Sequence, residues 1–325
     1  MEKRTKKKRK CKWLRNTQLI ALLLIVPTII YSVYQYNSGL TEASDGLYKD
    51  DGKTFDSFEG PEPQFGEINI LLMGSDARPN RGGLSDTLMI AHYNQKTHNL
   101  KLASIMRDTY VEVPGHGKQK INAAFAFGGP ELVRKTILQN FDLDINYYAV
   151  VDFQGFPKII DIVAPNGIDV DIPNEMKYGI GMTLHSGKQT LHGDELLGYV
   201  RFRHDSKSDF GRVERQQEVL SKAKEQAISV HSLVSLPKLL GIADPYIDTN
   251  IDKRTILTIG KGLLIGKGQQ METLRIPVKD SFKDERVNVG SVLSIDFDKN
   301  KQALHEFLSG DGESATETDL VFPKE

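Results

Sequence analysis

Cysteine and several well-known catalytic motifs are scarce or absent in this chain of 325 residues. The single cysteine, Cys11, lies in a basic run, which excludes an internal disulfide and a cluster of thiolate metal ligands. No Walker A loop, G-x-S-x-G element or H-E-x-x-H motif occurs, which argues against P-loop nucleotide hydrolysis, serine catalysis and zinc protease chemistry. The eight histidines form no ligand array, and we interpret them as surface or core residues.

Charge is distributed unevenly along the chain. Residues 1–15 hold nine of the 42 Lys and Arg residues, so the remainder carries a net charge of about −9. Residues 17–36 have no charged side chain, and a helix of that length spans the roughly 30 Å hydrocarbon core of a bilayer. We therefore predict a basic cytoplasmic tail at 1–16 and one transmembrane signal-anchor helix at 17–36. The domain that follows would be extracellular, as in a single-pass type II protein of the cell membrane.

Two other interpretations of the N-terminus are less consistent with the sequence. A cleaved signal peptide would need a site of small residues after the apolar stretch, and none is present. A DNA-binding arm would need a folded basic module, whereas the basic run before the apolar stretch has only fifteen residues and the rest of the chain is acidic. We therefore expect no nucleic-acid partner.

The residues after the predicted span suggest an α/β domain. A polar stalk is predicted at 37–64, the folded domain at 65–309 and a polar C-terminal tail at 310–325. Short apolar runs predict strands at 68–73, 87–93, 100–106, 147–153 and 272–276. Helical spacing predicts helices at 122–140, 156–163, 193–203, 211–229, 233–242, 253–264 and 301–308. This alternation of strands and helices favours layered α/β architecture.

Acidic residues stand at both ends of the first predicted loop. Asp76 follows the first strand and Asp86 precedes the second, while Arg107 follows the third. Carboxylate oxygens suit Mg²⁺, which commonly takes one or two of them together with waters and a phosphate oxygen. If the three strands are adjacent, the sequence places a cation site and an arginine at one sheet edge.

The acidic domain contains a stretch of fifteen residues with four arginines, namely Arg201, Arg203, Arg212 and Arg215. Gln216 is four residues after Arg212 and so shares its helical face. A guanidinium binds phosphate oxygens in a bidentate manner and keeps its charge, as a diphosphate site requires. The alternative, a solvated surface whose arginines pair with nearby carboxylates, remains open from the residues alone.

A set of motifs in fixed order resembles the LytR-CpsA-Psr family of Gram-positive envelope proteins. The motifs lie between residues 68 and 220 and read LLMGSDAR, SDTLMIAHYN, LASIMRDTYVEVPG, KINAAFAFGG, YYAVVDFQGF, GKQTLHGDELLGYVRFRH and DFGRVERQQEVL. The resemblance implies an α/β/α sandwich with a mainly β central sheet and an apolar tunnel for a polyprenyl tail. The stretches 156–163 and 191–200 could line that tunnel or form ordinary core.

The resemblance also implies an activity. The implied activity is that of a phosphotransferase, which moves an anionic glycopolymer, such as wall teichoic acid, from an undecaprenyl-pyrophosphate carrier to peptidoglycan. The implied cofactor is Mg²⁺, with Mn²⁺ as a substitute. By motif, Asp76 and Asp86 would bind the metal, and Arg107, Asp209 and Arg212 would be catalytic, with Asp209 as the base. The pyrophosphate would be held by Arg78, Arg107, Lys120, Arg201, Arg203, Arg212 and Gln216. A membrane regulator that affects virulence and antibiotic resistance, and a module that only binds the lipid-linked precursor, are the alternatives.

Overall fold

Six strands form the central sheet of the structure, a computed structural model that describes residues 27–41, 55, 57–75, 85–230, 235–266 and 268–310. Their order is β10-β3-β2-β1-β6-β9, and the sheet is mixed because β1 pairs with β2 antiparallel and with β6 parallel. The strands are β1 (Glu67–Ser75), β2 (Ser85–Asn94), β3 (Leu100–Ile105), β6 (Tyr147–Asp152), β9 (Ile247–Thr249) and β10 (Glu272–Ile276).

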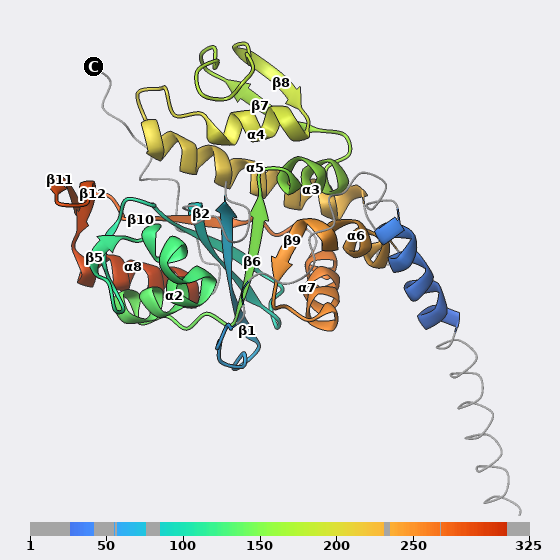
Figure 1. Ribbon diagram of the computed structural model, residues 1–325. Coiled ribbons are helices and arrows are strands. Elements are labelled where there is room, and N and C mark those ends of the chain that lie inside the picture. The colour runs from blue at the N-terminus through green and yellow to red at the C-terminus, as the bar shows by residue number, and fades with distance from the viewer. Residues whose placement is uncertain are drawn as a thin grey trace, which may run out of the picture.

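Alternation along β1 divides the apolar side chains between the two faces of the sheet. Leu71 and Met73 join the cluster covered by α2 (Ala123–Phe141) and α8 (Phe297–Ser309). Ile68 and Ile70 join the cluster covered by α7 (Lys253–Ile265) and by Leu220 of α5 (Ser208–Val230). Because successive strand residues point to opposite faces, one strand contributes to both cores. Helices therefore cover both faces (Figure 1), and the α/β prediction is confirmed.

A second group of elements packs around α5 above the sheet in Figure 1. It comprises α3 (Gly155–Val163), β7 (Ile168–Ile172), β8 (Gly187–Leu191) and α4 (Gly193–Arg201). Their apolar side chains form a separate cluster in which Ile160, Leu191 and Leu196 are 4% exposed or less. The stretches considered as tunnel lining thus supply buried core in this structure.

Several short elements escaped the sequence prediction. They are the hairpins β4 (Tyr110–Val113) with β5 (Gly117–Lys120), β7 with β8, and β11 (Phe282–Val287) with β12 (Gly290–Ile295), together with β9. β5 reads GKQK and β11 reads FKDERV, so neither shows the apolar alternation of a half-buried strand. The predicted long helices and strands were found within a few residues of their expected ends. They include α6 (Leu236–Ala243), which is followed by the short 3-10 helix η1 (Asp244–Tyr246).

The described residues before β1 contact the domain at two places. Residues 27–41 form a helix whose Gly39 is packed on α6, and the Tyr36 hydroxyl donates to Asp244 Oδ2 at 2.8 Å. Phe58 packs against the α2-side core, with its ring centroid 5.0 Å from that of Tyr148, and the Glu59 N–H donates to Glu131 Oε2 at 3.0 Å. The described part of the predicted stalk therefore belongs to the folded unit.

The predicted transmembrane helix is only partly described. Residues 17–26 lie outside the described ranges, as does the tail from 311 to 325. Within the part of the chain that the structure describes, no helix has both the length and the apolar character needed to cross a bilayer.

Candidate functional site

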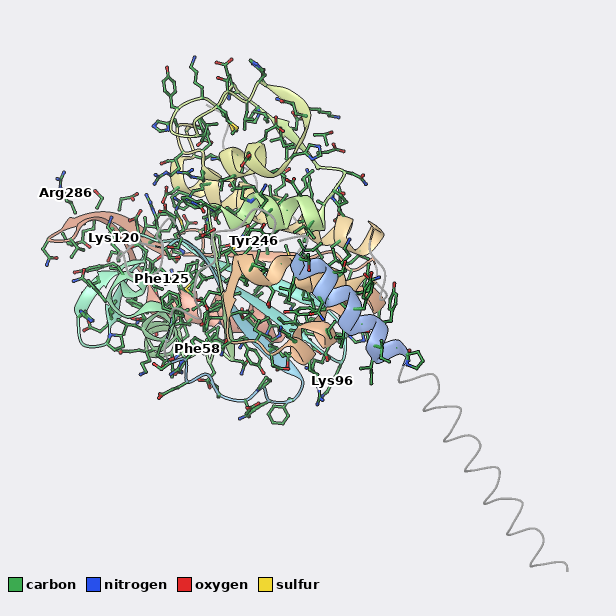
Figure 2. All side chains as sticks on the ribbon, turned by 45° about the vertical axis from the view of Figure 1, so that its right-hand side comes forward. Phe58, Lys96, Lys120, Phe125, Tyr246 and Arg286 are labelled. Carbon is green, nitrogen blue, oxygen red and sulfur yellow. The ribbon has the colours of Figure 1, made fainter. Side chains whose placement is uncertain are left out.

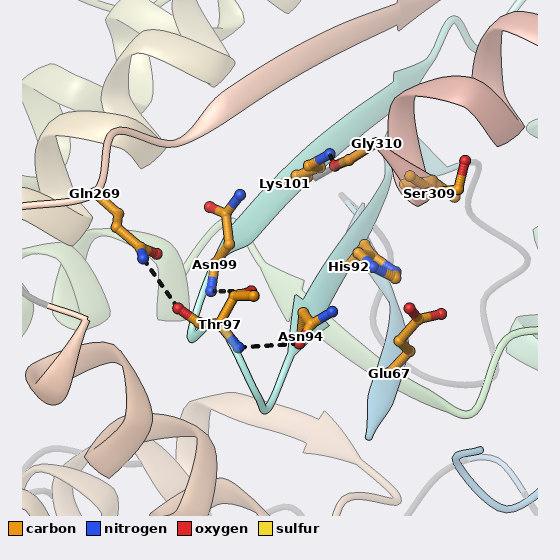
Figure 3. Close-up of a pocket in the computed structure, with 10 residues that line it drawn as sticks. Glu67, His92, Asn94, Thr97, Asn99, Lys101, Gln269, Ser309 and Gly310 are labelled. Atoms are coloured by element: carbon orange, nitrogen blue, oxygen red, sulfur yellow. Dashed lines mark hydrogen bonds between the residues drawn. The ribbon is translucent and has the colours of Figure 1, made fainter. Parts of the chain in front are cut away.

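The two ends of the central sheet carry different polar groups. At the end where β1 begins, Glu67, His92 and Lys101 line a hollow of about 290 Å³ (Figure 3). Lys101 Nζ donates to the carbonyl of Phe307 at 2.7 Å and also to that of Gly310, which holds the C-terminus of α8. Burial lowers the pKa of His92, whose Nδ1 lies 2.8 Å from the Asn69 side chain. These groups support the fold, and none of the predicted site residues is among them.

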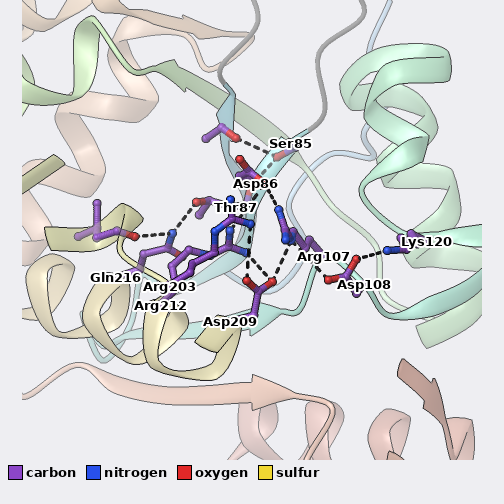
Figure 4. Close-up of polar contacts among 12 residues, drawn as sticks. Ser85, Asp86, Thr87, Arg107, Asp108, Lys120, Arg203, Asp209, Arg212 and Gln216 are labelled. Atoms are coloured by element: carbon purple, nitrogen blue, oxygen red, sulfur yellow. Dashed lines mark hydrogen bonds and ion pairs between the residues drawn. The ribbon is translucent and has the colours of Figure 1, made fainter. Parts of the chain in front are cut away.

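The opposite end of the sheet brings predicted site residues together. β1 ends at Ser75, β2 begins at Ser85 in antiparallel register, and β3 returns to the same edge before Arg107. Ser85 Oγ donates to the carbonyl of Thr87 at 2.6 Å, which fixes the start of β2. Arg107 Nη1 consequently lies 2.6 Å from Asp86 Oδ1 (Figure 4). The expected adjacency of the three strand ends is correct.

Asp209, in the first turn of α5, is the centre of the arginine cluster. Its Oδ2 accepts from Arg107 Nε at 2.8 Å and from Arg212 Nη2 at 3.0 Å, and its Oδ1 lies 3.8 Å from Arg203 Nη1. Arg212 Nη1 is also 3.7 Å from Asp86 Oδ1. Three guanidinium groups from three different segments thus converge on one carboxylate, as Figure 4 shows.

Lys120 and Asp108 extend the cluster along β5. Lys120 Nζ donates to Asp108 Oδ1 at 2.7 Å, and Asp108 Oδ2 lies 3.5 Å from Arg107 Nε. Asp108 stands directly after Arg107, yet its role was not predicted. Only the β4–β5 hairpin, which brings Lys120 back opposite Tyr110, reveals it.

Three further contacts hold the first turns of α5. Gln216 Nε2 donates to Thr87 Oγ1 at 2.9 Å, which joins the helix to β2 beside Asp86. Arg215 Nη1 pairs with Asp205 at 2.7 Å, and its Nη2 donates to the Phe202 carbonyl. Arg215 therefore positions the loop that carries Arg203, and Gln216 holds α5 against β2 beside Asp86.

Burial and charge act in opposite directions on the arginines. Burial lowers the pKa of Arg212 to about 10, because its side chain is only 4% exposed; Asp209 opposes this shift and Arg107 adds to it. For Arg107, burial also acts to lower the pKa, but Asp209, Asp86 and Asp108 together raise it. Both side chains are therefore charged at neutral pH, and the Nε of Arg212 has no hydrogen-bond partner among the described residues.

The structure does not place every predicted residue in this cluster. The Arg201 guanidinium lies over the Phe153 ring, 4.3 Å from its centroid, and forms no ion pair with the carboxylates of the described cluster. Asp76 and Arg78 lie outside the described residues. Within the described ranges, no three His, Cys, Asp or Glu side chains are grouped in a way that would hold a metal ion.

The arrangement as a whole is cationic. Arg107, Arg203 and Arg212 converge on one carboxylate, and among the described residues Asp86 supplies the one further carboxylate in contact with Arg212. Fixed guanidinium groups at a strand edge bind phosphate oxygens through charge-assisted hydrogen bonds. The site is therefore suited to binding an anion with several oxygens.

Comparison with known proteins identifies the family. The sequence profile of the LytR_cpsA_psr family matches residues 30–306. The chain belongs to this family. It is 41% identical over 284 residues to the regulatory protein MsrR of Staphylococcus aureus strain COL, covering 87% of this chain and 86% of that protein.

Family relatives include proteins named as transferases. The chain is 34% identical over 238 residues to the polyisoprenyl-teichoic acid–peptidoglycan teichoic acid transferase TagU of Bacillus cereus, covering 71% of this chain and 76% of that one. Its fold is similar to the crystal structure of B. subtilis TagV, with a TM-score of 0.63 and 29% identity over 74% of this chain and 97% of that chain. The fold of this chain, with its central mixed sheet, is thus the fold of the family.

Proposed function

We propose that this protein is a membrane-anchored phosphotransferase of cell-wall assembly. It would transfer an anionic glycopolymer of the wall-teichoic-acid type from an undecaprenyl-pyrophosphate carrier to a peptidoglycan hydroxyl. The observation that carries the proposal is the convergence of Arg107, Arg203 and Arg212 on Asp209 at the sheet edge. The name of the TagU relative and the uncharged stretch at 17–36 support the substrate class and the anchor.

The arginines would bind the pyrophosphate in place of Asp209. In the free protein Asp209 occupies guanidinium donors, which keeps three like charges close together at low cost. A pyrophosphate offers more negative charge and more acceptor oxygens than one carboxylate. Binding would therefore transfer the donors of Arg107, Arg203 and Arg212 from Asp209 to the substrate.

The reaction is an in-line displacement at the phosphorus next to the glycopolymer. The acceptor oxygen forms the new P–O bond, the P–O bond to the lipid phosphate breaks, and polyprenyl monophosphate leaves. Asp209, released from the arginines, is the proposed base that takes the hydroxyl proton. Arg107 and Arg212 stabilise the negative charge on the leaving phosphate, which is the main contribution that a protein makes to phosphoryl transfer.

A magnesium ion is the proposed cofactor, with manganese as a substitute because both accept oxygen ligands. Asp86 fits this role: its carboxylate lies at the strand edge within the arginine cluster and is 27% exposed. Asp76 is the second proposed ligand by motif. When bound, the ion would neutralise charge on the pyrophosphate.

The test is a transfer assay with the full-length protein in detergent micelles. A labelled undecaprenyl-pyrophosphate glycan, peptidoglycan oligomers and Mg²⁺ would be incubated with wild type, Arg107→Ala, Asp86→Ala and the control Arg254→Ala. Arg254 is exposed on α7, on the far side of the sheet from α2. We expect metal-dependent product with wild type and the control, and at least a hundredfold loss with the site variants. Tight donor binding without product from any protein would refute the proposal.

A regulatory role is the second candidate, since the MsrR relative is named a regulatory protein. If regulation is an indirect result of wall assembly, Arg107→Ala should remove both transfer and the regulatory phenotype. If signalling is separate, the phenotype should survive in that variant.

A further inference from the structure

An aromatic stack on the surface is not explained by the core or by the arginine cluster. The His116 and Phe127 rings lie 4.3 Å apart, centroid to centroid, with an angle of 11° between their planes. Phe127 is 47% exposed, whereas its neighbours Ala124 and Phe125 are buried in the α2-side core. A single exposed aromatic side chain is common on protein surfaces, but two stacked rings present a flat apolar face that a ligand can cover.

The backbone holds both rings at the surface. Helix α2 is interrupted directly after Phe127, where Gly128 and Gly129 have non-helical dihedral angles and Pro130 follows. Gly129 has a φ of +60°, and a Cβ there would lie 2.7 Å from the Phe55 ring, so a glycine is required. His116 stands in the turn of the β4–β5 hairpin. A break in helix α2 therefore holds the Phe127 ring at the surface, and a tight hairpin turn holds the His116 ring there.

The hairpin connects this stack to the phosphate site. Its Tyr110–Lys120 pair is at the arginine end, where Lys120 binds Asp108. The other end of the hairpin is the turn that carries His116, about 10 to 13 Å away at 3.3 Å per residue. At the base of α2, the Asn122 N–H donates to the Arg107 carbonyl at 3.3 Å. Both supports of the stack thus begin at residues next to Arg107, and Figure 2 shows Lys120 and Phe125 on the same flank.

The chemistry of the stack suits a sugar ring. A pyranose has a face of C–H groups that packs on the electron-rich face of an aromatic ring, and a rim of hydroxyls. The hairpin also carries polar side chains: Glu112 stands opposite Lys118 in the strand register, and Lys118 Nζ lies 5.9 Å from the Tyr110 centroid. A distance of 10 to 13 Å is about the length of two linked sugars.

We propose that the His116–Phe127 stack is a pyranose-binding subsite for the acceptor glycan strand. It would hold that strand a sugar or two away from the hydroxyl that reacts beside Arg107. This inference rests on the proposed function for the identity of the strand, but the binding of sugar by the stack can be measured without any transfer. The donor glycopolymer is the alternative occupant, and the test separates the two.

The first measurement is binding by the full-length protein in micelles without donor or metal. The probe is a β-1,4-linked tetramer of N-acetylglucosamine, and binding is followed by saturation-transfer NMR and calorimetry. We expect about tenfold weaker binding by Phe127→Ala, partial loss by His116→Ala and near wild-type binding by Phe127→Trp. Tyr178→Ala is the control, because Tyr178 is a 63% exposed aromatic outside this region. Equal binding by wild type and Phe127→Ala would overturn the inference.

The second measurement is steady-state transfer by the same variants. Phe127→Ala should raise the KM for long peptidoglycan oligomers about tenfold, with kcat and the donor KM unchanged and little effect on a disaccharide acceptor. A rise in the donor KM alone would assign the stack to the glycopolymer and refute the proposal. If wild type binds the tetramer through Phe127 but transfers nothing, the proposed function fails while the sugar subsite stands.

Discussion

Replacing Asp209 with asparagine tests whether this carboxylate substitutes for the substrate in the free protein. Breaking a buried ion pair costs about 3 to 5 kcal/mol because a charge is left unpaired. Arg212 is 4% exposed and loses its partner at 3.0 Å, but Asp86 remains 3.7 Å away. The side chains of Arg107 and Arg203 are 21% and 40% exposed, so water replaces part of the interaction that each loses with Asp209. We therefore expect Asp209→Asn to lower the free energy of unfolding by about 2 to 3 kcal/mol.

Thermal unfolding of the full-length protein, with and without inorganic pyrophosphate, measures this effect. For a domain of this size the loss corresponds to a Tm lower by roughly 5 to 10 °C. Pyrophosphate should raise the Tm of Asp209→Asn more than that of wild type, because no carboxylate competes for the arginines. Asp284→Asn, on an exposed strand of the β11–β12 hairpin, is the matched control and should leave the Tm unchanged. An undiminished Tm, or equal stabilisation of both proteins by pyrophosphate, would refute the reasoning.

Four further predictions concern stability, interfaces and the site. The pKa of Glu131 is lowered to about 2 despite burial, through hydrogen bonds from the neighbouring arginine and from a backbone N–H. Wild type should therefore exceed Glu131→Gln in stability by about 3 kcal/mol at pH 7. This advantage is present above pH 4.5 and is lost as the pH falls to about 2, as urea unfolding would show. Gly241→Leu should detach the helix at 27–41, because no Cβ fits there. Hydrogen exchange in α6 should then accelerate, whereas Gly260→Ala, whose Cβ has ordinary contacts, should change nothing. Gln216→Ala should reduce kcat/KM for the donor about fivefold, the equivalent of one hydrogen bond of roughly 1 kcal/mol. Removal of metal by EDTA should abolish transfer, and either Mg²⁺ or Mn²⁺ should restore it.

The strands of the central sheet and the helices that cover it could be predicted, because the pattern of apolar residues within each segment is local. β1 contains a short apolar run, and the apolar residues of α2 recur roughly at helical spacing, so the local pattern is enough to indicate both elements. The hairpins β4–β5 and β11–β12 could not be predicted, because β4 and β5 have only four residues each and because β5 and β11 are polar strands without a buried residue.

Residue type and spacing predicted that Asp86 and Arg107 lie together, because both stand at strand ends and adjacent strands bring such ends together. Only the family resemblance predicted that Arg212 joins them. The role of Asp108 depends on the return of Lys120 along a hairpin, and the convergence of three arginines on Asp209 joins segments a hundred residues apart. The same reason explains Arg201: its place beside Phe153 is set by the packing of α4 on α3 and α5, which spacing along the chain does not encode. The sequence by itself determined which chemistry the chain can perform, because charge and residue type are local properties. Only the tertiary structure decided which charges meet, because contacts between distant segments depend on how the whole core packs.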